Sequence, residues 1–470
     1  MNKIKFGTGG FRAVIGEDFT KENVQLICQA ISNIIIKQNK KKLVCIGYDN
    51  RFMSEHFARW CAEVFAGNKI KVELLNKATS TPVVMYATKI LQNDFGVMIT
   101  ASHNPYVYNG VKVFIHEGKD ADIETTNLIE KEIEAIKQIK SIDFDVALNK
   151  EIILVNYVDD YVSNIIKALN LQSFSTNDNI IFDAMFGSSV SAINLLCEKL
   201  NIKNYQIIND RRDAFFSFRT PAPNSNNLEY LKNAVKQNKA SIGFALDADG
   251  DRLAVIDEKG NYIDNNYLLA ICYYFLVKYC GLKGGSVKNV ATSNLLDIVT
   301  NKLGFTCYEV PVGFKHISAG IINNNAIIGG ESSGGLAIHG HIWGKDSLLA
   351  IALCLKTMVE LNKPFSKILQ EVIHFADDYN KVIYDEQFSY NEVQKQVIND
   401  LLFNKKVLPQ QKLKIKNIVI SDYVKIFYTN GDWVLVRFSG TEPILRIFVE
   451  ADTLTDCKQI VEDWKKFLSL

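Results

Sequence analysis

Asp247, Asp249 and Asp251 place three carboxylates on one short loop, in the sequence Asp247-Ala-Asp-Gly-Asp-Arg252. An apolar run before the loop predicts a buried strand, and Gly250 allows the positive φ that a tight turn can need. Three hard oxygen ligands suit Mg²⁺, which prefers octahedral coordination and keeps room for a phosphate oxygen. The alternatives are an Asx-rich surface turn or an incomplete Ca²⁺ loop, but no EF-hand loop ending in Glu follows. The position at a strand end, with Arg252 beside it, favours the metal site.

Ser102 lies at the end of another predicted strand, where the run Gly96–Ile99 gives way to Thr100-Ala-Ser-His-Asn-Pro105. A further apolar run resumes after Asn109-Gly110, so the pattern predicts a strand, a polar loop and a second strand. In an α/β sheet the reacting groups gather in loops beyond the carboxyl ends of the strands. For a Ser-His pair alone, the alternative is an ordinary turn in which the serine side chain bonds the backbone.

A third polar loop, Arg437-Phe-Ser-Gly-Thr-Glu-Pro443, joins two predicted strands near the C-terminus. Arg437 offers a forked donor, and Gly440 permits a close approach of the backbone to a ligand. The hydroxyls of Ser439 and Thr441 add further donors. These groups together predict a phosphate-binding loop, with a polar hairpin loop as the alternative.

Two glycine-rich segments carry weaker signals. Gly330-Glu-Ser-Ser-Gly334 combines an acidic side chain with hydroxyls that can bond the hydroxyls of a sugar. Lys5-Phe-Gly-Thr-Gly-Gly-Phe-Arg12 can bring backbone N–H groups to an anion, but it lacks the preceding strand and the spacing of a dinucleotide-binding motif. A plain turn is the simpler interpretation of this second segment.

Strands that alternate with helices must position these loops. The alternation begins three times along the chain, which predicts three similar mixed α/β domains, each with a mostly parallel sheet. We place these domains at residues 1–155, 156–262 and 263–375. From Tyr379 onward the sequence predicts a helix, an antiparallel meander at Val424–Ala451 and a C-terminal helix, so residues 376–470 are predicted to form an α+β domain.

Composition limits the classes of function. The chain has 470 residues, 47% hydrophobic and 22% charged, as expected for a soluble globular protein of several domains. Its 53 Lys and Arg residues nearly balance 52 Asp and Glu residues, so no global field recruits nucleic acid or an anionic membrane. The nine cysteines are scattered singly, as in a reducing compartment, and no apolar stretch is long enough for a membrane span. We therefore expect a cytoplasmic location.

The polar loops, in this order along the chain, resemble those of the α-D-phosphohexomutase superfamily of phosphoglucomutases and phosphomannomutases. The matching segments are Thr100-Ala-Ser-His-Asn-Pro105, Asp247-Ala-Asp-Gly-Asp-Arg252, Gly330-Glu-Ser-Ser-Gly334 and Arg437-Phe-Ser-Gly-Thr-Glu-Pro443. The resemblance covers the whole chain. It implies an isomerase that acts as an intramolecular phosphotransferase, with four domains around a central cleft and the last domain as a phosphate-binding lid.

The resemblance also implies a role for each loop. Ser102 would carry a phosphate, and Mg²⁺ would lie between that phosphate and the three aspartates. Arg12, His103 and Lys112 resemble the family's residues near the reacting oxygen, with a solvated strand face as the alternative for Lys112. The further site residues that it implies are Lys345 in catalysis and Arg252, Gly313, Glu331, Ser333, Arg437, Ser439, Gly440 and Thr441 in substrate binding.

Two further stretches of the sequence indicate which sugar phosphate is the substrate. His341-Ile-Trp-Gly-Lys345-Asp346 resembles a segment of phosphoglucomutases, and together with Pro311-Val-Gly-Phe-Lys315 it favours glucose phosphate. Gly335 stands where dual-specificity phosphomannomutases often have histidine. Phosphomannomutase, phosphoglucosamine mutase and phosphopentose mutase remain alternatives, and a non-catalytic phosphosugar-binding protein is the alternative from another class. We expect a phosphorylated hexose substrate, a sugar 1,6-bisphosphate activator and no obligate protein partner.

Overall fold

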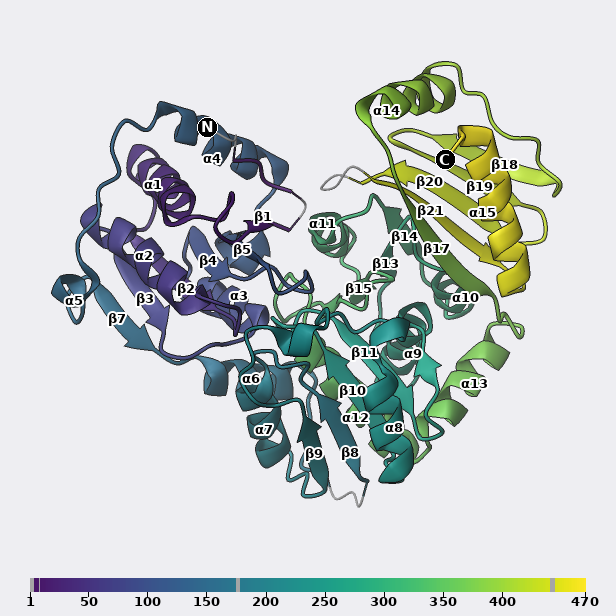
Figure 1. Cartoon of the computed structure of the whole chain (residues 1–470). Coiled ribbons are helices and arrows are strands. Elements are labelled where there is room, and N and C mark those ends of the chain that lie inside the picture. Colours follow the sequence, from purple (N-terminus) through teal and green to yellow (C-terminus); the bar gives the residue numbers. More distant parts are fainter. Residues whose placement is uncertain (1–3, 8, 175–177, 440–443) are drawn as a thin grey trace. The chain divides into compact units, whose positions relative to one another are not determined.

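The protein is described from a computed structural model, which covers residues 4–7, 9–174, 178–439 and 444–470. The chain divides into two compact units. The first consists of Met1–Asn289 and Leu296–Val372, and the second of Val290–Leu295 and Ile373–Leu470. The first unit contains three mixed sheets and the second contains one antiparallel sheet, and their elements can be followed in Figure 1.

The first sheet has seven strands and lies in the N-terminal part of the first unit. Its strands are β1 (Phe11–Val14), β2 (Leu43–Tyr48), β3 (Lys71–Leu75), β4 (Phe95–Ile99), β5 (Tyr108–Ile115), β6 (Lys119–Asp120) and β7 (Ile152–Val155). The helices of this region are α1 (Lys21–Lys37), α2 (Ser54–Gly67), α3 (Thr81–Ile90), α4 (Ile123–Ala135) and α5 (Phe144–Ala147). The strand order is β1-β5-β4-β2-β3-β7, with β6 paired to β5.

The second sheet has five strands in the order β12-β11-β10-β8-β9. Its strands are β8 (Ile180–Asp183), β9 (Tyr205–Ile208), β10 (Ile242–Leu246), β11 (Leu253–Asp257) and β12 (Tyr262–Ile263), and the helices are α6 (Val158–Ala168), α7 (Val190–Lys199) and α8 (Glu229–Gln237). Every residue of β4 and of β10 is buried, which explains why both sequences are continuously apolar.

The third sheet has four strands in the order β14-β13-β15-β16. Its strands are β13 (Ser286–Asn289), β14 (Cys307–Val310), β15 (Ile328–Gly330) and β16 (Leu336–Ile338). The helices are α9 (Asn265–Lys278), α10 (Leu295–Lys302), α11 (Phe314–Asn324), α12 (Ser347–Leu361) and α13 (Phe365–Phe375). No helix in the described part of the chain is both long and apolar enough to cross a membrane.

The three sheets of the first unit share one arrangement of strands. In each, a strand that is parallel to a neighbour ends in a polar loop, and the next strand returns antiparallel to it. The pairs are β4 and β5, β10 and β11, and β15 and β16. The serine loop, the aspartate loop and the glutamate loop of the sequence analysis therefore occupy equivalent positions in three similar domains. The predicted mixed α/β class of these domains is confirmed, while the boundaries 1–155, 156–262, 263–375 and 376–470 stay predictions.

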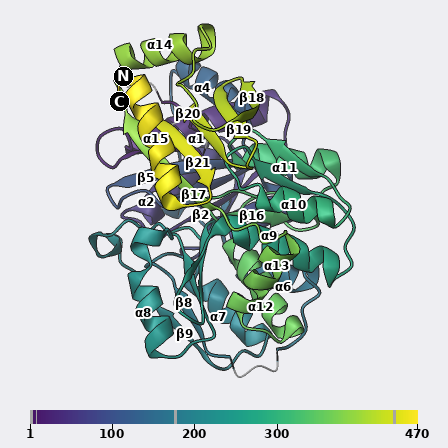
Figure 2. The same cartoon turned by 90° about the vertical axis from the view of Figure 1, so that its right-hand side faces the viewer.

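The second unit contains a five-stranded antiparallel sheet in the order β17-β21-β20-β19-β18. Its elements are β17 (Val382–Ser389), α14 (Glu392–Asn399), β18 (Ile415–Ile420), β19 (Tyr423–Tyr428), β20 (Trp433–Phe438), β21 (Ile444–Ala451) and α15 (Leu454–Leu468). Helix α15 packs on β21 and β17, as Figure 2 shows. The segment Val290–Leu295 joins this unit through the buried Glu450 carboxylate, which accepts hydrogen bonds from Ser293 Oγ and from the Asn294 backbone N–H at 3.1 Å.

The helix predicted between Tyr379 and the meander is present as α14, but the sequence analysis missed β17, which precedes it. The sequence Val382–Ser389 alternates between partly covered and exposed side chains, and none of its residues is fully buried. An edge strand of this kind has little apolar signal, since its stability comes from the backbone pairing with β21. Strand β18 was missed for the same reason, because it is the other edge strand and most of its residues are exposed.

Candidate functional site

Ser102 lies in the loop between β4 and β5 and is only 1% exposed. Its φ of 52° is in the left-handed region, which a non-glycine residue adopts only where its surroundings enforce it. The Ser102 backbone N–H donates to Thr100 Oγ1 at 2.8 Å. The Ser102 hydroxyl donates to Asp247 Oδ2 at 2.8 Å and lies 3.3 Å from His103 Nδ1. The structure therefore brings the predicted phosphate carrier to the predicted metal loop.

The aspartate loop is a tight turn between β10 and β11. Carboxylate oxygens of Asp247, Asp249 and Asp251 all lie within 4.8 Å of one another, and all three residues are buried. Gly250 has a φ of 67°, and a Cβ at this position would lie 2.2 Å from Ser189 Oγ, so the turn requires glycine. The Asp247 Oδ1 atom accepts the backbone N–H of Asp251 at 2.9 Å, which fixes the first carboxylate within the loop.

Lys112 on β5 compensates part of this negative charge. Its Nζ donates to Asp249 Oδ2 at 2.6 Å and to Asp251 Oδ2 at 2.8 Å, and the residue is only 4% exposed. The alternative of a solvated strand face is therefore wrong for Lys112. Burial disfavours its charge, but Asp249 and Asp251 outweigh burial and raise the pKa of Lys112 above its usual value.

The triad fits a divalent cation. Asp249 Oδ1 and Asp251 Oδ1 are buried and accept no hydrogen bond from any residue that the structure describes. Burial, together with the charges of Asp249 and Asp251, raises the pKa of Asp247 well above its usual range. Burial acts in the same direction on Asp251, but neighbouring cations, led by Lys112, outweigh it and hold the pKa of Asp251 well below its usual range. Two buried carboxylate oxygens without hydrogen-bond partners, in a triad whose oxygens lie within reach of one ion, suit Mg²⁺.

Arg12 and His103 are also close to the serine loop. Arg12 Nη1 donates to Ala101 O at 3.2 Å and to Asn104 Oδ1 at 2.7 Å. Burial, and then the charges of Arg252 and Arg12, lower the pKa of His103 well below its usual value. Its imidazole is therefore neutral at physiological pH. The backbone N–H of Arg252 donates to the first carboxylate of the triad at 3.0 Å.

Lys345 reaches the triad from the third domain, with its Nζ 3.7 Å from Asp251 Oδ2. The next residue, Asp346, is the N-cap of α12 and is fully buried. His341 Nε2 lies 2.7 Å from Asp346 Oδ2, and the Tyr161 hydroxyl donates to Asp346 Oδ1 at 2.6 Å. The stretch 341–346 is thus held from both ends, which fixes the backbone that carries Lys345.

The glutamate loop joins β15 and β16. Glu331 Oε1 accepts the Gly313 backbone N–H at 3.1 Å and the Asn289 amide at 3.0 Å, so the two predicted residues Glu331 and Gly313 are in direct contact. Ser333 is partly exposed in the same turn. A Cβ at Gly335 would lie 2.1 Å from Lys345 Cδ. The stem of Lys345 therefore occupies the space that a side chain at position 335 would need.

The predicted phosphate loop lies in the second unit. Arg437 is near the end of β20, paired with Tyr423 on one side and Arg446 on the other. The Ser439 backbone N–H donates to Ile444 O at 2.8 Å and closes the loop. Gly440 and Thr441 lie outside the described residues.

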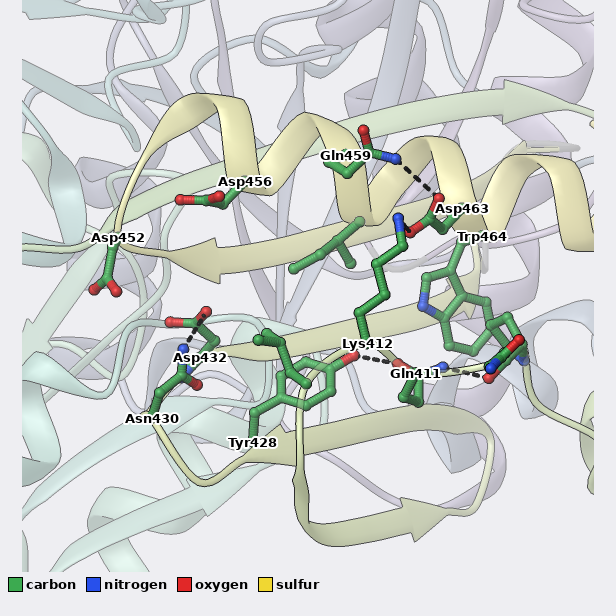
Figure 3. Close-up of a pocket in the computed structure, with 14 residues that line it drawn as sticks. Gln411, Lys412, Tyr428, Asn430, Asp432, Asp452, Asp456, Gln459, Asp463 and Trp464 are labelled. Carbon is green, nitrogen blue, oxygen red and sulfur yellow. Dashed lines mark hydrogen bonds and ion pairs between the residues drawn. The ribbon is translucent and has the colours of Figure 1, made fainter.

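A separate pocket of about 340 Å³ lies in the same unit, between the segment 409–413 and α15 (Figure 3). The ammonium of Lys412 lies 2.9 Å from Asp463 Oδ2 at its rim, and Gln411 accepts the Tyr428 hydroxyl. Neither Arg437 nor Ser439 lines this pocket, so it is distinct from the predicted phosphate loop.

Two buried residues of the site escaped the sequence analysis. Thr81 Oγ1 donates to Asp249 Oδ2 at 2.5 Å, and the Thr81 backbone N–H donates to Asp249 O at 2.8 Å. Arg51 Nη2 donates to Ser102 O at 2.5 Å. The sequence holds a signal in both places, since Asp49-Asn-Arg51 follows β2 and Thr79-Ser-Thr-Pro82 comes soon after β3, and reacting groups gather beyond the ends of such strands.

Comparison with known protein families gives matches along most of the chain. Four family models match, and all are described as phosphoglucomutase/phosphomannomutase. The alpha/beta/alpha domains I, II and III match residues 3–140, 159–260 and 264–375, and the C-terminal domain matches residues 392–466.

Relatives match over nearly the whole chain. A protein of Methanosphaera stadtmanae, described as a probable phosphoglucosamine mutase, is 30% identical over 469 residues, which are 99% of this chain and 98% of the relative. A phosphoglucomutase/phosphomannomutase of Thermococcus kodakarensis is 29% identical over 98% of this chain and 97% of its own. A protein of Thermus thermophilus with a solved structure shares 26% identity and a TM-score of 0.85 over 100% of this chain and 99% of its own. The chain therefore belongs to the phosphoglucomutase/phosphomannomutase family, within the α-D-phosphohexomutase superfamily, and is a mutase that isomerises by phosphoryl transfer.

Proposed function

We propose that this enzyme interconverts hexose 1-phosphates and hexose 6-phosphates through a phosphate carried on Ser102. One observation carries the proposal. The Ser102 hydroxyl, held on a left-handed backbone, lies 2.8 Å from Asp247, whose triad can hold a cation. An ordinary surface turn would neither bury this serine nor direct it at carboxylates.

Atoms and protons balance in the proposed transfer. A sugar hydroxyl oxygen forms a bond to phosphorus, the bond from phosphorus to Ser102 Oγ breaks, and the hydroxyl proton ends on Ser102 Oγ. His103 is neutral and lies 3.3 Å from that oxygen, so it can relay the proton. A second transfer from the other end of the bisphosphorylated sugar returns the phosphate to Ser102. The net reaction is an isomerisation, and a sugar 1,6-bisphosphate activator would load an enzyme that has lost its phosphate.

The charge of the site requires a cation. A phosphoserine carries a charge of about −1.5 to −2 at neutral pH, and it would face the three carboxylates. We infer that Asp247, Asp249 and Asp251 hold Mg²⁺ together with the phosphate on Ser102. When bound, Mg²⁺ would neutralise this repulsion and polarise the phosphoryl group. Lys112 and Arg12 bring further positive charge to the two sides of the serine loop.

Substrate contacts follow from the remaining loops. We propose that Glu331 and Ser333 bond the sugar hydroxyls and that Gly313 orients Glu331 through its backbone N–H. We propose that Lys345, whose Nζ lies 3.7 Å from Asp251 Oδ2, contacts the reacting end of the sugar. The residues proposed to bind phosphate are Arg252, Arg437, Ser439, Gly440 and Thr441.

Glucose phosphate is our first choice of substrate. Lys345 belongs to the phosphoglucomutase-like stretch, and its stem fills the space beside Gly335. A histidine at position 335, as in dual-specificity phosphomannomutases, would collide with that stem, so the two features support each other. Glucosamine phosphate is the second candidate, because the Methanosphaera stadtmanae relative is described as a phosphoglucosamine mutase.

The test is a panel of glucose, mannose and glucosamine 1-phosphates, with Mg²⁺ and a trace of the matching 1,6-bisphosphate. We expect turnover of glucose 1-phosphate, its loss on chelation of Mg²⁺, and its loss in Ser102→Ala. Ser421→Ala, in an exposed turn, is the matched control. Turnover by Ser102→Ala near that of the wild type would disprove the phosphoserine mechanism, and a preference for glucosamine 1-phosphate would replace glucose as the substrate.

A further inference from the structure

Arg51 has no part in the phosphoryl transfer proposed above, yet its side chain is completely buried beside the serine loop. Its guanidinium donates to four backbone carbonyls of that loop. The acceptors are Ser102 O at 2.5 Å, Asn104 O at 2.6 Å, Pro105 O at 2.9 Å and Tyr108 O at 3.0 Å. One planar cation therefore satisfies most of the inward-facing carbonyls of the loop that presents the serine.

Asp49 holds the Arg51 guanidinium and is itself held by further hydrogen bonds. Asp49 Oδ2 lies 3.4 Å from Arg51 Nε, and the same oxygen accepts the Thr100 hydroxyl at 2.6 Å. Asp49 Oδ1 accepts the Ser54 hydroxyl at 2.8 Å. The carboxylate thus connects the end of β2, the start of α2 and the start of the serine loop, and it holds the guanidinium in one orientation.

The second domain covers the other side of Arg51. The ring centroid of Phe216 lies 5.0 Å from Arg51 Cζ, and Phe216 is 1% exposed. Phe216, Ser217 and Phe218 have φ values of 50°, 51° and 57°, so this segment has a strained backbone that packing must hold in place. The Asn50 amide donates to Phe186 O at 3.0 Å and Gly187 O at 2.8 Å, which joins the two domains at the same point.

We propose that Arg51 is a positioning residue for phosphoryl transfer, and that Phe216 of the second domain locks Arg51 in place. The inference rests on the proposed role of Ser102 as phosphate carrier. Without Arg51, the carbonyls of Ser102, Asn104, Pro105 and Tyr108 lose their buried donor, and the left-handed backbone at Ser102 is held less firmly. Without Phe216, water reaches the guanidinium and competes with the loop carbonyls. The serine loop is therefore in its working geometry only when the second domain, which carries the aspartate triad, is docked on the first.

The test uses Phe216→Leu and Arg51→Lys in the full-length enzyme. Lysine cannot reproduce a planar set of donors, so we expect kcat to fall about 100-fold in Arg51→Lys and about tenfold in Phe216→Leu, with KM within twofold. Amide hydrogen exchange in the peptide 100–109 should become faster in both variants. The matched control is Phe275→Leu, since Phe275 on α9 is also fully buried. It should lower thermal stability to a similar extent without changing kcat or exchange in this peptide.

The result that overturns the inference is a Phe216→Leu enzyme with wild-type kcat and wild-type exchange at 100–109. An equal loss of kcat in Phe275→Leu would also overturn it, because the effect would then be one of general stability. If Arg51→Lys does not fold, kcat and hydrogen exchange at 100–109 in Phe216→Leu alone test the inference. Intact-mass measurement of Ser102 phosphorylation separates the two proposals. Absent phosphate on the wild-type enzyme after incubation with Mg²⁺ and glucose 1,6-bisphosphate refutes the carrier role of Ser102, whereas hydrogen exchange still tests the positioning by Arg51.

Discussion

Replacing Lys112 with methionine keeps much of the side-chain volume but removes the ammonium that bonds Asp249 at 2.6 Å and Asp251 at 2.8 Å. At an effective dielectric constant of about 20, each contact contributes roughly 6 kcal/mol of Coulomb attraction before the cost of burying the charges. That cost offsets much of the gain, and breaking a buried ion pair by removing one partner destabilises a protein by about 3–5 kcal/mol. We expect a loss of this size for Lys112→Met in the absence of metal.

Added Mg²⁺ should restore most of the lost stability. The variant leaves the triad more negative, so the ion should bind it more tightly than in the wild type. A ligand at about 100 times its dissociation constant stabilises the folded state by about 2.7 kcal/mol. The measurement is urea unfolding at neutral pH with EDTA or with saturating Mg²⁺, compared between Lys112→Met and the wild type.

Lys288→Met is the matched control for this experiment. Lys288 is 1% exposed and pairs with Asp297 at 2.5 Å and with Glu309 at 3.7 Å, away from the triad. It should lose stability in EDTA, and Mg²⁺ should stabilise it only as much as it stabilises the wild type. The reasoning is refuted if Lys112→Met unfolds within about 1 kcal/mol of the wild type in EDTA, or if Mg²⁺ stabilises both variants equally.

Three further substitutions test other parts of the structure. Partial burial acts to raise the pKa of Glu371, but hydrogen bonds from Lys363, Tyr279 and Tyr274 outweigh it and lower this pKa to about 2. The ionised Glu371 therefore stabilises the folded state at neutral pH, and this stabilisation is lost as the pH falls from about 4.3 toward 2. Solvent screens this partly exposed group, so Glu371→Gln should cost only about 1 kcal/mol at neutral pH and flatten the unfolding free energy over that window; an unchanged acid profile would contradict this. Asp346→Asn weakens the hydrogen bonds that fix the backbone beside Lys345, so kcat should fall about tenfold. A change confined to thermal stability would mean that Asp346 is only a helix cap. Glu450→Gln weakens the bond that the Trp433 indole donates, so the unfolding free energy of the second unit should fall by about 1–3 kcal/mol. The measurement is the urea midpoint followed by the fluorescence of Trp433, and a wild-type midpoint would argue against this bond.

The sequence was sufficient where an apolar run ends in polar residues. Ser102 and Asp247 follow continuously buried strands, and the change from apolar to polar letters marks the edge of a sheet. The mixed α/β class of the first three domains followed from the alternation of predicted strands and helices along the sequence. The family membership rested on these loops and is confirmed by the match of all four domain models.

Contacts between distant segments could not be predicted from local patterns. Thr81 meets Asp249 across 168 positions, and Tyr161 meets Asp346 across 185. A threonine in the first turn of a helix and a tyrosine on an amphipathic one are ordinary in sequence. Their roles depend on how the domains dock, which no periodicity encodes. Lys112 shows the same limit, because only the fold decides whether a strand lysine faces solvent or buried carboxylates.

The short segment Val290–Leu295 belongs to the second unit although the chain on both sides of it belongs to the first. The chain therefore crosses between the units three times, at 289–290, 295–296 and 372–373. Three chain segments, rather than a single linker, therefore connect the two units. A proteolytic cut near residue 373 would not release the second unit, because Glu450 still holds Ser293 and Asn294.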